Sequence, residues 1–311
     1  MSTLILSHND CLKHVEPVGH PERVKRLEKV LDVLKLSIFN DLTWKEAPLA
    51  KKEQIALCHS SDYINKIEKI YTSNTPSQID ADTYFGTGSL AAAKRAVGAN
   101  ILAVDSVISG EFDKVFAAVR PPGHHAENSK AMGFCIFGNV AIAAKYAIEI
   151  HGLNRVAVVD FDVHHGNGTQ DLLWNEPRTL FCSMHQSPLW PGSGQKDETG
   201  GFNNIINIPV DPETDGEKIK TIFNNSILPK LESFRPELLI ISAGFDAHAD
   251  DPLANLNLVE EDYAWITHKL CDVAEKYCNG RLVSSLEGGY NLEALAASVA
   301  AHVNVLMERS K

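Results

Sequence analysis

Residues 155–168 read RVAVVDFDVHHGNG, an apolar run that passes into two carboxylates, two histidines and two glycines. The first part, residues 155–161, has the continuous apolar pattern of a strand that is buried on both faces. Because alternate residues of an extended chain share a face, Asp160, Asp162 and His164 are predicted to point the same way, with the residues between them turned into the core. The stretch therefore predicts a buried strand that ends in a group of metal-ligand side chains.

Helical and strand patterns alternate along the rest of the chain. Strands are predicted at residues 114–119, 155–161, 179–184, 205–210, 237–243 and 281–286. Helices are predicted at residues 22–36, 89–109, 139–151, 215–234, 260–277 and 291–308, and Pro229 is expected to bend or end the fourth. Apolar strands that alternate with helices indicate an α/β fold with a parallel sheet covered on both faces. With no internal repeat and no linker-like segment, residues 1–311 are predicted to form a single domain.

Polar segments follow five of the predicted strands. They read RPPGHHA (120–126), DFDVHHGNG (160–168), SMHQSPLWPGSG (183–194), SAGFDAH (242–248) and LEGGYN (286–291). In the first segment two prolines stop the strand, so His124 and His125 are presented with little freedom. Because ligands of parallel α/β sheets bind beyond the carboxyl ends of the strands, these five segments are predicted to meet at one active site.

The predicted metal site needs a third ligand beside Asp162 and His164. Asp246, at the end of another buried strand, is the expected one, and His248 is the alternative. Three protein ligands leave a position for water, which is typical of a catalytic site, and a divalent cation lowers the pKa of that water from about 15.7 to roughly 7. Zn²⁺ is expected, although Fe²⁺, Co²⁺ or Mn²⁺ also suits an oxygen-rich ligand set. The other interpretation is that Asp162 and His164 cap a helix at residues 168–174.

Composition limits the classes of function. The chain has 311 residues, of which 44% are apolar and 22% charged, and 29 basic against 40 acidic residues give a net charge of −11. It has no basic stripe, no apolar run near the roughly 20 residues of a membrane span, and no signal-peptide pattern at the N-terminus. Its six cysteines form no CxxC pair and are predicted to be reduced thiols, mostly in the core. A cytoplasmic protein that binds neither nucleic acid nor membrane is predicted.

Five motifs together resemble a known family. In chain order, RPPGHHA, GFCIFGN, VDFDVHHGNGTQ, SAGFDAH with DPL, and EGGYN are similar to the motifs of the histone deacetylase family. Asn167 and the form EGGYN resemble the class II branch and the bacterial deacetylase-like amidohydrolases. The resemblance runs from about His20 to beyond Asn291. It implies an arginase/deacetylase-like fold, with a central, mainly parallel eight-stranded sheet flanked by helices.

The resemblance also implies an activity, the zinc-dependent removal of acetyl or other acyl groups from amines. Asp162, His164 and Asp246 match the metal ligands, and Tyr290 matches the tyrosine that hydrogen-bonds the substrate carbonyl. The resulting hypothesis is that a metal-bound water attacks an amide carbonyl lying between the metal and Tyr290. Such a tyrosine acts as an oxyanion-hole donor.

The tandem histidines are implied to divide the proton chemistry. His125 is expected to take the proton of the water and pass it to the departing amine, whereas His124, paired with Asp160, is expected to stay positively charged. Asn167 stands where other branches of the family place a carboxylate behind the second histidine. Different partners give two adjacent imidazoles different pKa values, which this division requires.

The resemblance also implies a substrate channel and a second cation. Phe134 and Trp190 match its two aromatic walls, and Trp190, which departs from the usual phenylalanine, is expected to narrow it. The other channel positions are Gly133, Leu253, Asp80 and Asp82. One of the two aspartates is implied to grip the substrate backbone, and a helix-capping role is the alternative. A monovalent cation, K⁺, is implied at Asp160, Asp162, His164, Ser183 and Met184, where Ser183 is alternatively an ordinary strand hydroxyl.

Three alternatives concern the substrate and the class of protein. Acylated lysine in proteins or peptides is the expected substrate, and a small acetylated polyamine is the runner-up. Polyamine-selective relatives place an acidic residue where this chain has Leu253, which favours lysine, although Asp250 and Asp251 lie nearby. A catalytically silent acyl-lysine-binding module is disfavoured because the motif residues are intact. A manganese ureohydrolase of the arginase type needs a two-metal cluster with more carboxylates.

Overall fold

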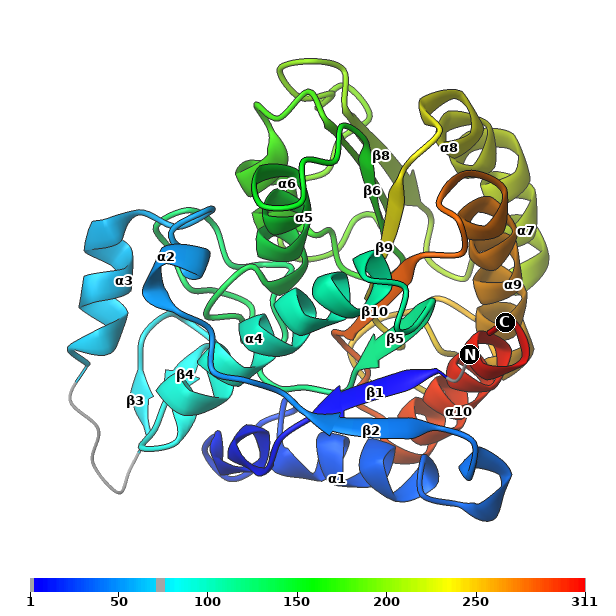
Figure 1. Cartoon of the computed structure of the whole chain (residues 1–311). Coiled ribbons are helices and arrows are strands. Elements are labelled where there is room, and N and C mark those ends of the chain that lie inside the picture. Colours follow the sequence, from blue (N-terminus) through cyan, green and yellow to red (C-terminus); the bar gives the residue numbers. More distant parts are fainter. Residues whose placement is uncertain (1–2, 71–75, 311) are drawn as a thin grey trace.

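An eight-stranded sheet runs through the centre of the molecule (Figure 1). The computed structural model describes residues 3–70 and 76–310. The strands lie in the order β2–β1–β5–β10–β9–β6–β7–β8, and every neighbouring pair is parallel. Their bounds are β1 Leu4–Ser7, β2 Thr43–Glu46, β5 Lys114–Ala117, β6 Val156–Asp160, β7 Thr179–Gln186, β8 Ile205–Val210, β9 Leu238–Ala243 and β10 Leu282–Leu286. The expected eight-stranded, mainly parallel sheet is confirmed.

Helices cover both faces of this sheet. On one face α4 (Ser89–Ile108) packs on β1, β5 and β10, and α5 (Asn139–Glu149) packs on β6 and β9. On the other face α10 (Leu292–Glu308) packs on β5 and α9 (Glu260–Tyr277) on β9, with α1 (Val24–Val33) against α10 (Figure 1). The remaining helices are α2 Lys52–Ile55, α3 Ser61–Glu68, α6 Asn167–Leu173, α7 Gly216–Ile222 and α8 Leu228–Phe234.

The six strands predicted from apolar runs are all present, with ends that differ by up to two residues. The edge strand β2 and its neighbour β1 were not predicted, and neither was the hairpin of β3 (Ser77–Gln78) and β4 (Tyr84–Phe85). These strands have two to four residues, too few for a periodic pattern to stand out. Strand β7 extends two residues beyond the predicted end, so His185 lies within it.

The helical segment predicted at 215–234 passes through Pro229 instead of ending there. A π-helical turn at Phe223–Ile227 separates α7 from α8, and Leu228 N donates to Phe223 O across it. Because proline has no N–H, the wider turn directly before Pro229 lets the chain stay helical without that hydrogen bond. Pro229 was expected to bend or end the helix: the helix does not end there, and the π-helical turn directly before Pro229 interrupts the regular α-helix.

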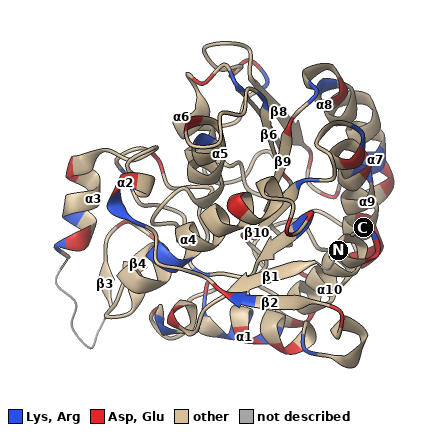
Figure 2. Cartoon of the chain, in the orientation of Figure 1, with Lys and Arg blue, Asp and Glu red and all other residues tan. Residues whose placement is uncertain are grey.

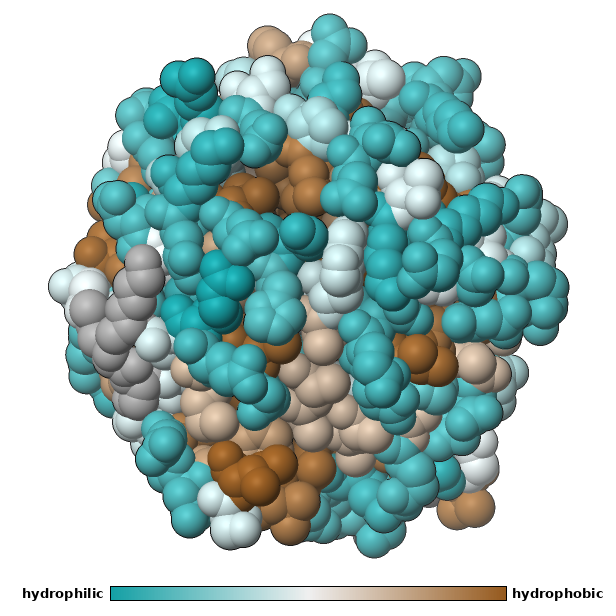
Figure 3. Space-filling model, turned by 90° about the vertical axis from the view of Figure 1, so that its right-hand side faces the viewer, coloured by the Kyte–Doolittle hydropathy of each residue, from teal (hydrophilic) through white to brown (hydrophobic). Residues whose placement is uncertain are grey.

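Apolar residues and cysteines lie in the core, and charged residues lie mostly on the surface. All residues of β5, β6, β9 and β10 are buried, and all six cysteines are buried free thiols, as predicted. Figure 2 shows basic and acidic residues interspersed along the outer helices, and Figure 3 shows a mostly hydrophilic face with some hydrophobic areas between. Within the described residues, no helix has the length and apolar character that crossing a membrane requires.

Candidate active site

Three predicted metal ligands meet beyond the carboxyl ends of two neighbouring strands. Asp162 and His164 follow β6, and Asp246 follows β9, which pairs with β6. One ligand atom from each of the three lies within 4.8 Å of the others, and both carboxylates are fully buried. His164 Nδ1 lies 3.2 Å from Asp162 Oδ1 and 3.1 Å from Asp246 Oδ2. The register of the parallel strands thus brings together residues more than eighty positions apart in sequence.

The surroundings of this group suit a divalent cation. Gly244 and Gly288 leave room for the carboxylates, because a Cβ on Gly244 would lie 2.0 Å from Asp162 Oδ2 and one on Gly288 2.1 Å from Asp246 Oδ2. Backbone N–H groups fix the remaining oxygens: Gly288 donates to Asp162 Oδ2 at 2.8 Å and Val163 to Asp246 Oδ1 at 2.9 Å. Burial and the Asp162 charge raise the pKa of Asp246 to about 7, so both oppose ionisation of this carboxyl group. A cation at this position would favour the ionised form.

The Gly288→Ala variant is expected to bind a divalent metal about 10- to 100-fold more weakly, the range seen when groups that orient metal ligands are disturbed. The added methyl group displaces the Asp246 carboxylate by direct contact. A competition titration with a chromophoric chelator measures the affinity. Gly86→Ala is the matched control, since its Cβ finds its nearest neighbour at 3.4 Å; equal affinities in both variants would contradict this arrangement.

The structure decides against two of the alternatives raised for this region. Helix α6 has Gly166 at its N-cap and no side-chain capping bond, so the interpretation of Asp162 and His164 as helix caps is wrong. His248 is not part of the metal-ligand group. Its Nδ1 accepts from Asp250 N at 3.0 Å, and its Nε2 lies 3.6 Å from Glu260. Asp246 is therefore the third member of the group.

The tandem histidines follow β5 and have different partners. Their ring centroids are 3.8 Å apart and both side chains are buried. His124 Nδ1 lies 3.0 Å from Asp160 Oδ2, whereas His125 Nδ1 lies 2.8 Å from Asn167 Oδ1. Each histidine thus meets the partner that the sequence analysis gave it, one a carboxylate and the other a neutral amide.

The surroundings of the two imidazoles shift their pKa values in opposite directions. Burial alone would lower the pKa of His124, but the Asp162 and Asp160 carboxylates raise it well above the usual range. Burial lowers the pKa of His125 well below the usual range, and the neighbouring His124 and His164 lower it further. The surroundings therefore favour the cationic form of His124 and the neutral form of His125.

A narrow channel leads to this group from the surface. Its volume is about 200 Å³, and it is lined by Asp82, His125, Gly133, Phe134, His164, Leu189, Trp190, Leu253 and Tyr290. The Trp190 ring packs edge-on against His125, with centroids 4.7 Å apart, and the Phe134 ring packs on Tyr290 at 5.8 Å. Gly133 has φ +55°, and a Cβ there would lie 2.5 Å from the His125 ring, so only glycine fits. Leu189 is the one residue of this lining that the sequence did not single out.

The two aspartates assigned to the channel lie in different places. Asp82 lines the channel, and its Oδ1 accepts from Gly133 N at 3.0 Å and from Thr83 Oγ1 at 2.9 Å. Asp80 is not among the lining residues, and its carboxylate lies 4.0 Å from Lys130 Nζ. Neither caps α4, whose N-cap is Gly88. Asp82 is thus the aspartate of the pair that lines the channel.

Tyr290 is fixed by two charged residues that the sequence analysis did not connect with it. The buried Arg26 guanidinium lies 4.9 Å from the Tyr290 ring centre, and its Nε donates to Gly289 O at 2.5 Å. Asp251 Oδ2 accepts from Tyr290 N at 2.7 Å, and Asp251 Oδ1 accepts from Leu253 N at 3.0 Å. One buried carboxylate therefore positions both the predicted oxyanion donor and the channel residue Leu253.

A second group of side chains of the kinds that bind metals consists of His14, Glu16 and Glu22. The positive charge beside this group comes from an arginine side chain. The buried Arg120 guanidinium donates to both oxygens of Glu22 and, at 2.6 Å, to Glu16 Oε1. Arg26 also donates to Glu22, at 2.9 Å. The group is therefore a buried salt-bridge cluster that joins Arg120, at the start of the tandem-histidine segment, to the turn that carries Tyr290.

The Glu22→Gln variant is expected to lose about 3 kcal/mol of unfolding free energy, because it leaves two buried guanidinium groups short of a carboxylate. Urea denaturation followed by circular dichroism measures the change. Glu28→Gln, on α1 just after Glu22 in the chain and with a side chain that is 40% exposed, is the control with little expected effect. Equal midpoints for the two variants would show that the cluster contributes nothing to stability.

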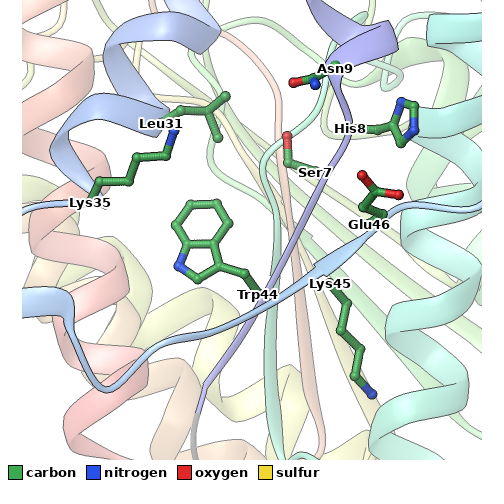
Figure 4. A pocket seen from close by; sticks show the side chains of 8 residues that line it. All are labelled: Ser7, His8, Asn9, Leu31, Lys35, Trp44, Lys45 and Glu46. Carbon is green, nitrogen blue, oxygen red and sulfur yellow. The ribbon is translucent and has the colours of Figure 1, made fainter.

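Another hollow lies beside the edge strand β2 (Figure 4). Its walls come from the ends of β1, α1 and β2, and Figure 4 shows Trp44 facing it, with Leu31 and Lys35 to one side and His8 and Glu46 to the other. It shares no lining residue with the channel. Four strands, β1, β5, β10 and β9, stand between β2 and β6, so this hollow is separate from the metal-ligand group.

The residues assigned to a monovalent cation come from two neighbouring strands. Asp160 on β6 is in register with Ser183 on β7, and Met184 follows it. Ser183 Oγ lies 3.0 Å from His185 Nδ1. The structure thus brings these residues close to the metal-ligand group, and the binding of K⁺ there stays a prediction.

Comparisons with known proteins identify the family of this chain. A family profile described as the histone deacetylase domain matches residues 20–306. The chain belongs to the histone deacetylase family. A probable deacetylase of Archaeoglobus fulgidus is 38% identical, over 94% of this chain and 82% of its own length. A histone deacetylase-like amidohydrolase of Pseudomonas aeruginosa is also 38% identical, over 88% of this chain and 73% of its own length.

A solved structure gives the same result for the fold. The crystal structure of the HDA15 HD domain matches 99% of this chain with a TM-score of 0.93 and 33% identity, and the match covers 89% of that chain. The arginase/deacetylase-like fold and the membership of the deacetylase and amidohydrolase family, both expected from five motifs, are confirmed.

Proposed function

We propose that this chain removes acetyl or other acyl groups from lysine side chains of proteins or peptides, with one divalent metal ion, preferably Zn²⁺, held by Asp162, His164 and Asp246. One observation carries the proposal: the three ligands, the unequal histidine pair and the Tyr290 side chain meet at the inner end of one channel. Asp162, His164 and Asp246 would hold the metal where its Lewis-acid chemistry could polarise an amide carbonyl and activate water. We further propose that residues 1–311 act as one catalytic domain.

His125 is the proposed base, and its hydrogen bonds indicate which nitrogen acts. Asn167 Nδ2 donates to Glu127 Oε1 at 2.8 Å, so the Asn167 oxygen faces His125 and can only accept. His125 Nδ1 therefore carries the proton, and the Nε2 lone pair of the neutral ring is free to take one from water. The same nitrogen then returns the proton to the departing amine.

His124 and Tyr290 are the proposed electrostatic partners of the reaction. A His124 ring kept cationic by Asp160 and Asp162 stabilises negative charge that develops on the carbonyl oxygen. The Tyr290 hydroxyl donates a hydrogen bond to that oxygen from the channel wall. Burial raises the pKa of Tyr290 well above its usual range, so the hydroxyl keeps the proton it donates.

The channel favours an acylated lysine over an acetylated polyamine. Leu253 lines the channel where an acidic residue would read a second ammonium group, and the aromatic walls of Phe134 and Trp190 suit a methylene chain. A polyamine is the second candidate because the exposed Asp250 lies beside the channel mouth, next to Tyr290 in a neighbouring hollow. The complete set of catalytic side chains argues against a silent binding module.

Turnover of an acetyl-lysine peptide and of an acetylated polyamine, measured in parallel, tests this choice. The zinc-loaded protein is expected to prefer the peptide, and the Leu253→Glu variant to shift towards the polyamine, with Leu253→Gln as the uncharged control of equal size. A wild-type preference for the polyamine would overturn the substrate assignment. Metal binding without turnover of either substrate would instead favour the binding module.

A further inference from the structure

Trp190 forms one wall of the channel although its side chain is 42% exposed. Its ring centroid lies 4.7 Å from that of His125 and 6.2 Å from that of His164. Burial alone does not fix a ring that water covers to this extent, because few contacts oppose its rotation and the movement of its backbone. The position of the ring therefore depends on how residues 187–195, the loop that follows β7, are fixed.

A buried histidine beneath this loop bonds to it. His165 Nδ1 lies 2.8 Å from Ser193 Oγ, and its Nε2 lies 3.1 Å from Gln170 Oε1. The Gln170 oxygen also accepts from Asn207 Nδ2 at 2.7 Å, which fixes the orientation of the amide. Because an amide oxygen only accepts, His165 Nε2 carries the proton, and Nδ1 accepts from the Ser193 hydroxyl.

His185 makes the second contact with the loop. Its Nε2 donates to Gly194 O at 3.0 Å, so its Nδ1 accepts from the Ser183 hydroxyl. Gly194 has φ +85°, and a Cβ there would lie 2.5 Å from His185 Nε2 and 2.6 Å from the His165 ring. The two rings, whose centroids are 4.7 Å apart, thus form a surface that the loop approaches so closely that only glycine fits.

Glu198 fixes the far end of the loop. Its carboxylate accepts from the backbone N–H groups of Gly194 and Gln195, each at 3.0 Å, and from Gln170 Nε2 at 2.6 Å. Partial burial opposes ionisation, but these donors lower the pKa of Glu198, so the acceptor is charged. Gln170 lies on α6 with Asn167, the partner of His125, so one helix supports both the loop and the proposed base.

We propose that His165, His185 and Glu198 are positioning residues that fix Trp190 against His125 and thereby set the width of the channel for the methylene chain of the substrate. None of the three lines the channel, so they act through the backbone of residues 187–195. The link to substrate rests on the proposed function, whereas the fixing of Trp190 is a property of the fold and has its own readout.

Glu198→Gln tests the proposal. The amide of the new side chain accepts hydrogen bonds through one oxygen only, so at least one of the bonds from Gly194 N, Gln195 N and Gln170 Nε2 is lost. Trp190 emission is isolated as the difference between each protein and its Trp190→Phe counterpart, since the chain has four tryptophans. Acrylamide is expected to quench this emission more strongly in the variant. The KM for an acetyl-lysine peptide is expected to rise about tenfold with kcat nearly unchanged.

Two further variants keep the test decisive. Ser193→Ala removes only the hydroxyl that donates a hydrogen bond to His165 Nδ1. It is expected to give a smaller change in both quenching and KM, and it replaces Glu198→Gln if that variant fails to fold. Glu217→Gln, whose side chain is 84% exposed on α7, is the control without effect. Unchanged quenching overturns the proposal, and so does a lower kcat at constant KM, which would place the effect at Asn167. Increased quenching in a protein that turns over no acyl-lysine supports the positioning role and contradicts the proposed function.

Discussion

The Asp246→Asn variant is expected to fold normally, to lose its divalent metal and to lose at least about 10³-fold in turnover, the scale of chemistry that depends on the metal. The amide oxygen of the new side chain would keep the hydrogen bond from Val163 N that Asp246 Oδ1 accepts. That orientation turns the amide nitrogen towards His164 and the metal position. An NH₂ group donates and carries no charge, so the site loses both a ligand atom and a negative charge.

Metal content by mass spectrometry and acetate release, measured on the same sample, check this expectation. Asp211→Asn is the control, because the Asp211 side chain is 85% exposed and lies beside Lys218. Full metal occupancy together with wild-type turnover in Asp246→Asn would remove Asp246 from the ligand set.

The Tyr290→Phe variant is expected to keep its metal and its stability while kcat falls about 10²- to 10³-fold, the usual cost of losing one oxyanion donor. The phenylalanine ring can keep the contacts with Phe134 and with the Arg26 guanidinium, since neither involves the hydroxyl. The loss should therefore appear in kcat, because the hydroxyl acts where charge develops on the substrate carbonyl.

Tyr263→Phe is a matched control for this variant. Tyr263 is fully buried, and its hydroxyl has no hydrogen-bond partner among the described residues, so removing it should leave kcat unchanged. Steady-state kinetics on an acetyl-lysine peptide, with metal content measured for both variants, separates the outcomes. Undiminished turnover in Tyr290→Phe would show that the oxyanion donor lies elsewhere.

The metal-ligand group was predictable because strand and ligand patterns coincide. Asp162 and His164 closely follow one apolar strand and Asp246 closely follows another, so the parallel-sheet rule alone brings them to one edge. The pairing of His124 with Asp160 and of His125 with Asn167 came from the family resemblance, because spacing within one sequence cannot say which loops meet.

The residues that position the site could not be predicted from the sequence. Arg26 stands on α1 among other charged residues and looks like part of a solvated face, yet it is fully buried against Gly289 and Glu287. Buried charges are rare, and only the tertiary partners show that one exists. Asp251 is a similar case, since its bonds to the backbone of Tyr290 and Leu253 join segments almost forty residues apart.

Short strands were the other features that the sequence did not predict. Strand β2 has four residues and alternates between half-buried and exposed positions, a pattern too brief to distinguish from a loop. The aspartate pair shows the same limit at the site: Asp80 and Asp82 are equivalent in sequence, and only the hydrogen bond to Gly133 N distinguishes the one that faces the channel.

The most direct test of the central claim is acetate release from an acetyl-lysine peptide before chelation, after the metal has been removed, and after one equivalent of Zn²⁺ per chain is added back. Release is expected to fall to background when the metal is removed and to return with Zn²⁺ in the wild type, but not in Asp246→Asn. Release that persists in metal-free protein would contradict metal-dependent hydrolysis at Asp162, His164 and Asp246.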